Sequence, residues 1–159
     1  MPGQFKYLFS AIKIGPLTVP NRIVFSAHLT NFAEGNLPSE RHAYYYAERA
    51  KGGAGLIISE EQSVHPTDFA YEKLIHAFDE RVVPRYRMIT GMVHKHGAKI
   101  LAQINHNGGQ ASGLHSRVPL WAPSPVADPL FREVAKEVEL NDIRELVEGF
   151  AQVARHVRE

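Results

Sequence analysis

The chain has 159 residues, of which 44% are hydrophobic and 22% are charged, and its formal net charge is +1. These values are typical of one globular domain and predict neither a nucleic-acid nor a membrane partner. The absence of cysteine excludes a disulfide scaffold, a thiolate zinc site and an iron–sulfur ligand set within the chain. The start does not resemble a signal peptide, and no apolar run approaches the roughly 18 residues of a membrane span, so we expect a cytoplasmic protein.

The first part of the chain predicts a hairpin, a strand and a helix, in that order. Residues 12–21 alternate around a Gly-Pro pair, which is typical of a small hairpin or plug. Residues 22–26 are mostly apolar, as expected for a strand that is buried on both faces. A helix is predicted to start after Ser39, which suits an N-cap, and to stop at the glycines at 52 and 53.

Two more units of strand followed by helix are predicted along the chain. The second strand covers residues 54–59, and its helix runs from about 79 to 96 with an apolar stripe that ends at Gly97. The third strand covers residues 99–104. After a long loop, the third helix begins at Asn141, with acidic residues near its start and basic residues near its end, which matches the helix dipole.

Strands that alternate with helices predict an α/β fold with a parallel sheet and right-handed crossovers. A crossover helix normally leads to another strand, and an eight-unit barrel needs roughly 250 residues. We therefore expect residues 1–159 to be the N-terminal portion of a (β/α)8 TIM barrel, with about three strand–helix units and an N-terminal hairpin. The chain is expected to be truncated before the fourth strand.

The ends of the predicted strands are where functional side chains gather in such barrels. Side chains alternate along a strand, so Gln103 should point into the barrel while the apolar residues beside it meet the helices. A buried amide needs a partner, which leaves open both a paired core glutamine and a ligand-binding residue. By the same alternation, Gly55, Ile57, Ser59 and Glu61 should share one face of the second strand.

The acidic pair Glu60-Glu61 at the second strand end has several possible roles. It could act as a general base, a metal ligand or an amide acceptor. For Glu60 we favour a solvated loop start or an ion pair with a nearby Arg or Lys, and for Glu61 both readings stay open. Nine histidines invite a metal hypothesis, but none lies in an HExxH arrangement and no three share a suitable spacing, so we expect no metal site.

Four segments resemble, in the right order, the NADH:flavin oxidoreductase or Old Yellow Enzyme family. LFSAIKIGPLTVPNRIVFSA resembles its plug hairpin and first strand, and GLIISEEQSVHP resembles its second strand and loop. HGAKILAQINHNGGQA resembles its third strand, and WAPSPV resembles the Pro-Ser element before its third helix. The Ser-Glu-Glu sequence is closest to trimethylamine dehydrogenase-like members, a branch that we group with the 2,4-dienoyl-CoA reductases.

The resemblance implies an FMN held at the strand ends, with NADH or NADPH as electron donor and an activated alkene as acceptor. Ala27, His28 and Leu29 match the segment whose backbone lies along the flavin ring. Gln103 matches the glutamine that bonds the pyrimidine edge, and Glu61 occupies a position close to the flavin. Leu29 departs from the Cys or Thr that many members carry there.

Catalytic residues stay unknown, because the proton donor and the phosphate-binding elements of the family would come after residue 159. We expect a small-molecule substrate, the remainder of the barrel as a partner, and a homo-oligomer. The alternative is a non-catalytic α/β binding or interaction domain.

Overall fold

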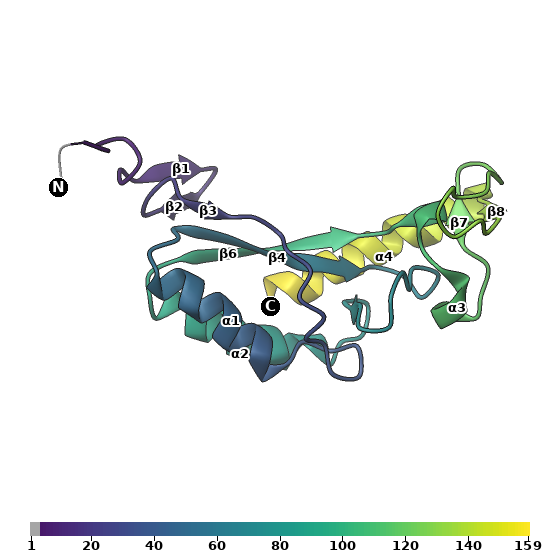
Figure 1. Ribbon diagram of the computed structural model, residues 1–159, viewed down its shortest axis with the longest axis horizontal. Coiled ribbons are helices and arrows are strands. Elements are labelled where there is room, and N and C mark those ends of the chain that lie inside the picture. Colours follow the sequence, from purple (N-terminus) through teal and green to yellow (C-terminus); the bar gives the residue numbers. More distant parts are fainter. Residues whose placement is uncertain (1–3) are drawn as a thin grey trace.

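The computed structural model describes residues 4–159 and has a parallel sheet at its centre (Figure 1). The strands β3 (Val24–Phe25), β4 (Leu56–Ser63) and β6 (Lys99–Asn105) form this sheet, and β4 lies between the other two. Both pairings are parallel, with Val24 opposite Leu56 and Leu56 opposite Lys99. This confirms the predicted strand–helix units. The first strand is shorter than predicted, and the second extends four residues further, to Ser63.

The remaining elements lie at the two ends of this sheet. The predicted N-terminal hairpin is present as β1 (Ile12–Ile14) and β2 (Leu17–Val19), which pair antiparallel. The short β5 (Ile75–His76) continues the sheet beside the C-terminal end of β4. The long loop after β6 contains elements that the sequence did not predict: a 3-10 turn at 108–110, α3 (Gly113–Ser116), β7 (Trp121–Ala122) and β8 (Lys136–Glu137).

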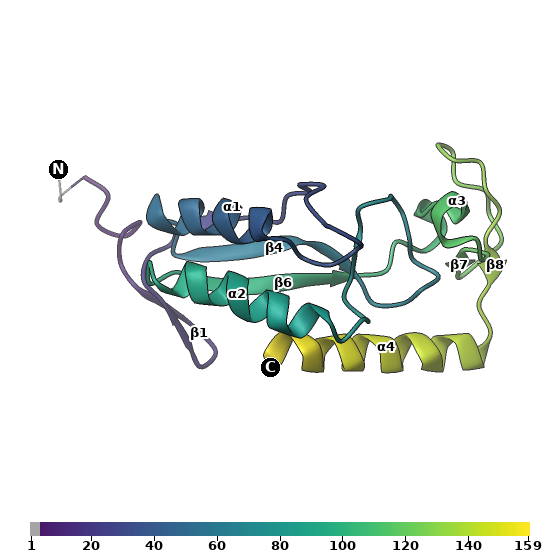
Figure 2. The same cartoon turned by 90° about the horizontal axis from the view of Figure 1, so that it is seen from below.

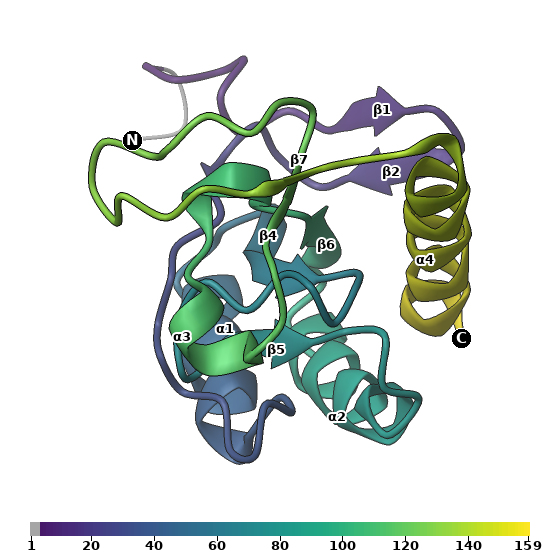
Figure 3. The same cartoon turned by 90° about the vertical axis from the view of Figure 1, so that its right-hand side faces the viewer.

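Three long helices cover the sheet on its outer side (Figures 2 and 3). They are α1 (Glu40–Lys51), α2 (Val82–His94) and α4 (Leu140–Arg158). Ser39 occupies the N-cap of α1, as predicted, and Glu139 caps α4 in a capping box with Asp142. None of the helices within residues 4–159 is both long and apolar enough to cross a bilayer.

The main core lies between the sheet and the first two helices. Its buried members are Ala43, Tyr46, Ala50, Ile57, Ile89, Val93 and Ala98. Burial of such side chains stabilises a fold by roughly 25 cal/mol per Å² of apolar surface removed from water. The predicted stripe of α2 is confirmed, because Val82, Ile89 and Val93 are buried and Tyr86 is partly buried.

A β-bulge interrupts β4 and changes the side on which its last residues lie. Ser59 pairs with Ala102 and Glu61 with Gln103, so Glu60 is the extra residue. A bulge places two residues of one strand opposite one residue of its neighbour. The prediction that Glu61 shares a face with Ile57 and Ser59 is therefore wrong. Glu60 takes the outer face, and Glu61 moves to the inner face beside Gln103.

The helix α4 approaches the loop after β4 at a glycine. A Cβ atom built on Gly149 would lie 2.8 Å from the main-chain oxygen of Val64. Only a glycine leaves room for this contact, which lets Val153 pack fully buried against Val64 and Ala77. The small residue therefore fixes how closely the third helix lies to the sheet.

The inner face of the sheet is open to solvent, and so is the free edge of β6. Leu101 is 45% exposed, Val24 is 51% exposed, and Leu29 beyond the end of β3 is 42% exposed. Ile100, by contrast, packs against the main core on the outer side. The alternation predicted for β6 is thus confirmed, and Gln103 lies on the inner face with Leu101.

Replacement of Gly149 tests the close approach of α4. Alanine favours a helix over glycine by about 1 kcal/mol, but at Gly149 its Cβ would collide with backbone. We expect Gly149→Ala to lower the free energy of unfolding by about 1–3 kcal/mol. Gly91→Ala in α2, where nothing lies within 4 Å of the added carbon, should raise it. The free energy of unfolding is measured with urea, and equal changes in the two variants would contradict the close contact at Gly149.

The open inner face leads to a second prediction. Exposed strand edges and apolar patches promote association, so a polypeptide of residues 1–159 should form oligomers or aggregates without a partner. Leu101→Lys places a charge on the open face and should raise the monomer fraction in sedimentation velocity. Tyr44→Lys, at an exposed residue of α1, is the control and should change it little. A monodisperse wild-type monomer would refute the prediction.

Candidate functional site

Polar side chains lie together on the inner face, at the carboxyl ends of β4 and β6. Glu61 is directly opposite Gln103, and Ser63 is opposite Asn105. The Nδ2 atom of Asn105 donates to Oε2 of Glu61 over 2.8 Å. The Gln103 side chain is exposed, so its carboxamide can both donate to and accept from a ligand on this face. The structure therefore brings Glu61 and Gln103 together, which strand alternation alone did not.

The segment Ala27–Leu29 follows β3, at the same end of the sheet. Ala27 is partly buried, whereas His28 and Leu29 are exposed. The His28 ring stacks on Tyr45 of α1 with centroids 6.4 Å apart. The next residue, Thr30, is tied by its main-chain N–H to Glu60. The first strand end is thus joined to the second through the residue that the bulge turns outward.

Glu60 is only 1% exposed, which contradicts the prediction of a solvated residue or an Arg or Lys partner. Its Oε1 atom lies 2.8 Å from Nε2 of His42, and its main-chain N–H donates to the Tyr46 hydroxyl. Buried carboxylates need such partners because desolvation of an unpaired charge is costly. No spacing in the sequence points to His42, because the pair joins two separate elements.

Tyr71 and Asp68 also lie near this site, although no pattern in the sequence predicts it. The hydroxyl of Tyr71 is buried near the Glu61 carboxylate and makes no hydrogen bond of ordinary geometry within residues 4–159. Burial raises the pKa of Tyr71, and the charges of Glu61 and Glu60 add to this shift, so the phenol keeps its proton. Burial also raises the pKa of Asp68, whose Oδ1 accepts from Asn107 over 3.0 Å.

A directed chain of hydrogen bonds joins the end of β6 to α4. Nδ1 of His106 accepts from the main-chain N–H of Gly108, so its Nε2 carries the proton that Thr67 Oγ1 accepts over 3.1 Å. The Thr67 hydroxyl then donates to Nδ1 of His65 over 2.8 Å. This leaves Nε2–H of His65 to donate to Oε1 of Glu145 over 3.0 Å.

The chain of hydrogen bonds requires a neutral His106. Burial, and then the neighbouring His65, lower the pKa of His106 to about 4, which agrees with this state. Among residues 4–159, no group of three or more His, Asp or Glu side chains is arranged to hold a metal ion. The histidines at the strand ends act as hydrogen-bonding groups in this structure.

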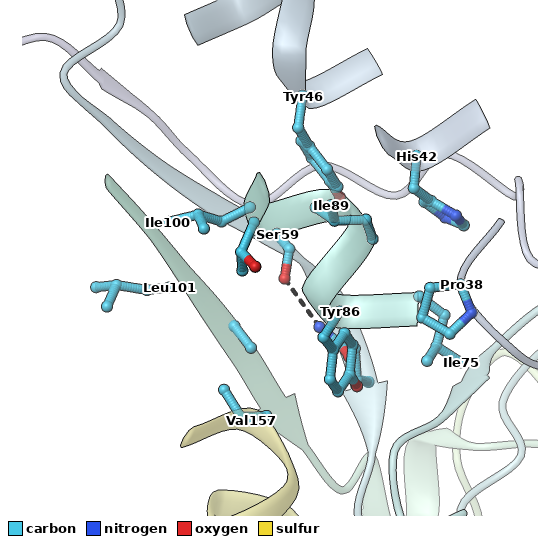
Figure 4. Close-up of a pocket in the computed structure, with 13 residues that line it drawn as sticks. Pro38, His42, Tyr46, Ser59, Ile75, Tyr86, Ile89, Ile100, Leu101 and Val157 are labelled. Atoms are coloured by element: carbon cyan, nitrogen blue, oxygen red, sulfur yellow. Dashed lines mark hydrogen bonds between the residues drawn. The ribbon is translucent and has the colours of Figure 1, made fainter. Parts of the chain in front are cut away.

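A pocket lies on the opposite, outer side of the sheet (Figure 4). Tyr86 and Ile89 of α2 face Ile100 of β6 across it, and Val157 of α4 lies at one end. Its polar groups are already paired: Gln62 donates to Ser59 over 2.8 Å and accepts from Tyr86. Because it lies between sheet and helices, this pocket is separate from the inner-face groups that the resemblance assigns to the flavin.

The parallel sheet with helices on its outer side is the arrangement of a segment of a β/α barrel. Residues 7–159 match the NADH:flavin oxidoreductase / NADH oxidase family, and the chain belongs to this family. The family is named for its flavin and for NADH, and one relative is named NADPH dehydrogenase. The resemblance inferred from the four segments is therefore confirmed.

Similar proteins include a dehydrogenase, an oxidase and one solved structure. The chain is 37% identical to N,N-dimethylglycine/sarcosine dehydrogenase of Chromohalobacter salexigens, covering 98% of this chain and 23% of that protein. It is 35% identical to NADH oxidase of Thermoanaerobacter brockii, covering 95% and 24% respectively. The Old Yellow Enzyme homologue of Zymomonas mobilis superposes with a TM-score of 0.88 at 30% identity, over 94% of this chain and 44% of that one. The chain thus spans about a quarter of the length of the first two relatives.

Because histidines are partly buried at the strand ends, we expect the folded protein to be less stable in acid. Burial lowers the pKa of His76 to about 4, and Nε2 of His76 has no partner within residues 4–159. An unfolded histidine titrates near 6.5, so between about pH 6.5 and 4 the unfolded chain binds more protons than the folded one. The free energy of unfolding should therefore fall as the pH drops through this range.

The variant His76→Phe isolates this effect. Phenylalanine keeps the ring contacts with Phe69 and Phe78 but cannot be protonated. Unfolding of this variant should depend less on pH between 6.5 and 4 than unfolding of the wild type. His94→Phe, at an exposed residue of α2, is the control and should keep the wild-type slope. Parallel curves for wild type and His76→Phe would show that His76 does not titrate with folding.

Proposed function

We propose that this chain is the N-terminal part of an FMN-dependent oxidoreductase whose cofactor lies against the inner-face ends of β3, β4 and β6. The observation that carries the proposal is the alignment of Glu61 with Gln103 on the open inner face. Family membership supports it, because the family uses a flavin. Bound FMN would supply hydride transfer between a reduced nicotinamide and a substrate.

The residues present fit such a cofactor. The exposed Gln103 carboxamide can pair with the adjacent N–H and C=O groups of a pyrimidine edge. The backbone of Ala27, His28 and Leu29 directly follows β3, outside any regular element, and could lie along a flat ring. Glu61, held by Asn105, adds a carboxylate beside the same site. These residues bind and orient, and no group within residues 4–159 is assigned as proton donor.

Two substrate classes are compatible with the relatives. The resemblance favours reduction of an activated alkene, as in enoyl or dienoyl substrates, and one relative is named a multifunctional alkene reductase/demethylase. The relative that is 37% identical is named for oxidation of N,N-dimethylglycine and sarcosine. We place alkene reduction first, with amine oxidation as the second possibility within the same flavin chemistry.

The intact protein that carries this sequence would also need the rest of the barrel. The open edge of β6 and exposed Leu101 favour a partner that continues the sheet, supplied by the remainder of the same barrel. A homo-oligomer and a cytoplasmic location stay part of the proposal.

The alternative is an α/β binding domain without redox chemistry, which would leave Gln103 without a cofactor. Absence of any spectral response when FMN is added to the intact protein would favour it.

The variant Gln103→Leu tests the flavin site in the intact protein that carries this sequence. Leucine would leave the pyrimidine groups unpaired, which should weaken FMN binding by roughly 1–3 kcal/mol, or about ten- to a hundredfold. The reduction potential should shift as well, because the amide stabilises charge on the reduced ring. Titration of apo-protein with FMN at one ionic strength measures the affinity.

Gln152→Leu is the matched control, since Gln152 is exposed on α4, away from the inner face. It should bind FMN like the wild type. If Gln103→Leu and the wild type have the same affinity for FMN and the same flavin reduction potential, Gln103 has no role in binding the cofactor.

A further inference from the structure

We infer that Glu60 is a positioning residue that holds the segment Ala27–Thr30 in place for the flavin. The inference rests on the proposed function, because it concerns the same strand ends. Glu60 is 1% exposed and faces away from the inner side, so it acts through its neighbours. The bulge places Glu60 where it contacts both the loop after β3 and the helix α1.

Both carboxylate oxygens of Glu60 accept hydrogen bonds from different elements. Oε2 accepts from the main-chain N–H of Thr30 over 2.5 Å, across 30 residues of sequence. Oε1 lies 2.8 Å from Nε2 of His42, in the first turn of α1. Hydrogen bonds to a carboxylate are roughly twice as strong as those between neutral groups. One side chain therefore fixes the loop after β3 relative to the helix that follows it.

The tautomer of His42 follows from its second nitrogen. Nδ1 of His42 lies 2.9 Å from the main-chain nitrogen of Ser39, whose N–H it accepts. The proton of a neutral ring must then be on Nε2, where it points at Glu60. Both neighbours of Glu60 are consequently donors, and the position requires an acceptor at each of its two oxygens. A carboxylate supplies two acceptors, whereas a carboxamide supplies only one.

The segment that Glu60 restrains is the one that would lie along the flavin. Thr30 follows directly after Ala27, His28 and Leu29, and the side chains of His28 and Leu29 are exposed. The Thr30 hydroxyl also accepts from the N–H of Phe32 over 3.2 Å, which continues the restraint along the loop. Loops that hold a ligand in one geometry depend on such supporting contacts.

The bulge couples the two roles of the acidic pair. Because Glu60 is the inserted residue, it points to the outer side and Glu61 points to the inner side. The outer carboxylate anchors the loop, and the inner one remains available next to Gln103. Adjacent residues with the same chemistry thus serve structure and ligand contact separately.

The variant Glu60→Gln tests the inference in the intact protein. It keeps the volume but must set its amide donor against either Thr30 N–H or His42 Nε2–H. We expect amide hydrogen exchange in the peptide covering residues 26–32 to become at least about tenfold faster, with FMN binding weakened about tenfold. Exchange at Ile57, which is fully buried, reports global folding and should be unchanged.

The control is Glu72→Gln, which makes the same charge change at an exposed residue of the loop after β4. It should leave both readouts unchanged. If Glu60→Gln lowers the global stability too far, His42→Phe, which keeps a ring but cannot donate to Glu60, should accelerate exchange in the same peptide.

The outcomes distinguish a failure of the positioning role from a failure of the proposed function. If the wild type binds FMN and the Glu60→Gln variant binds it equally well, the positioning role alone is overturned. The same holds if residues 26–32 stay protected from exchange in the variant. Wild-type protein that fails to bind FMN would overturn the proposed function and the inference together. Faster local exchange with weaker FMN binding and an unaffected Ile57 would establish Glu60 as the residue that positions the loop.

Discussion

The parallel pairing of β4 with β3 and β6 is the constraint on which the rest of the structure depends. Each residue of β4 faces either the helices or the open inner side, and its pairing with β6 decides which. Ile57 joins the main core on the helix side. A single inserted residue, Glu60, then shifts the alternation by one position. Odd-numbered residues therefore face the helices before the bulge and the inner side after it.

This shift decides which of the two adjacent glutamates lies on which side of the sheet. Without the bulge, Glu60 would lie opposite Gln103 on the inner face, and Glu61 would lie against the helices. With it, Glu61 lies opposite Gln103 and accepts a hydrogen bond from Asn105. The buried Glu60 meanwhile links the loop after β3 to α1. The site is thus assembled from three strand ends that are distant in sequence.

The sequence predicts well what depends on local pattern. Apolar runs and helical stripes give the three strand–helix units, and strict alternation places Gln103 correctly because β6 is regular. Alternation fails at Glu61 because a bulge is set by pairing with a strand some 40 residues away. The His42–Glu60 pair and the chain from His106 to Glu145 join separate elements, so no spacing in the sequence reveals them.

The most direct test of this account is a crystal structure of the intact protein with FMN bound. The account predicts the flavin ring against the inner-face ends of β3, β4 and β6, with the Gln103 carboxamide within hydrogen-bond distance of the pyrimidine edge. Glu61 should face the ring and Glu60 should face His42. Flavin found in the pocket between the sheet and α2, or a regular β4 that turns Glu61 toward the helices, would contradict it.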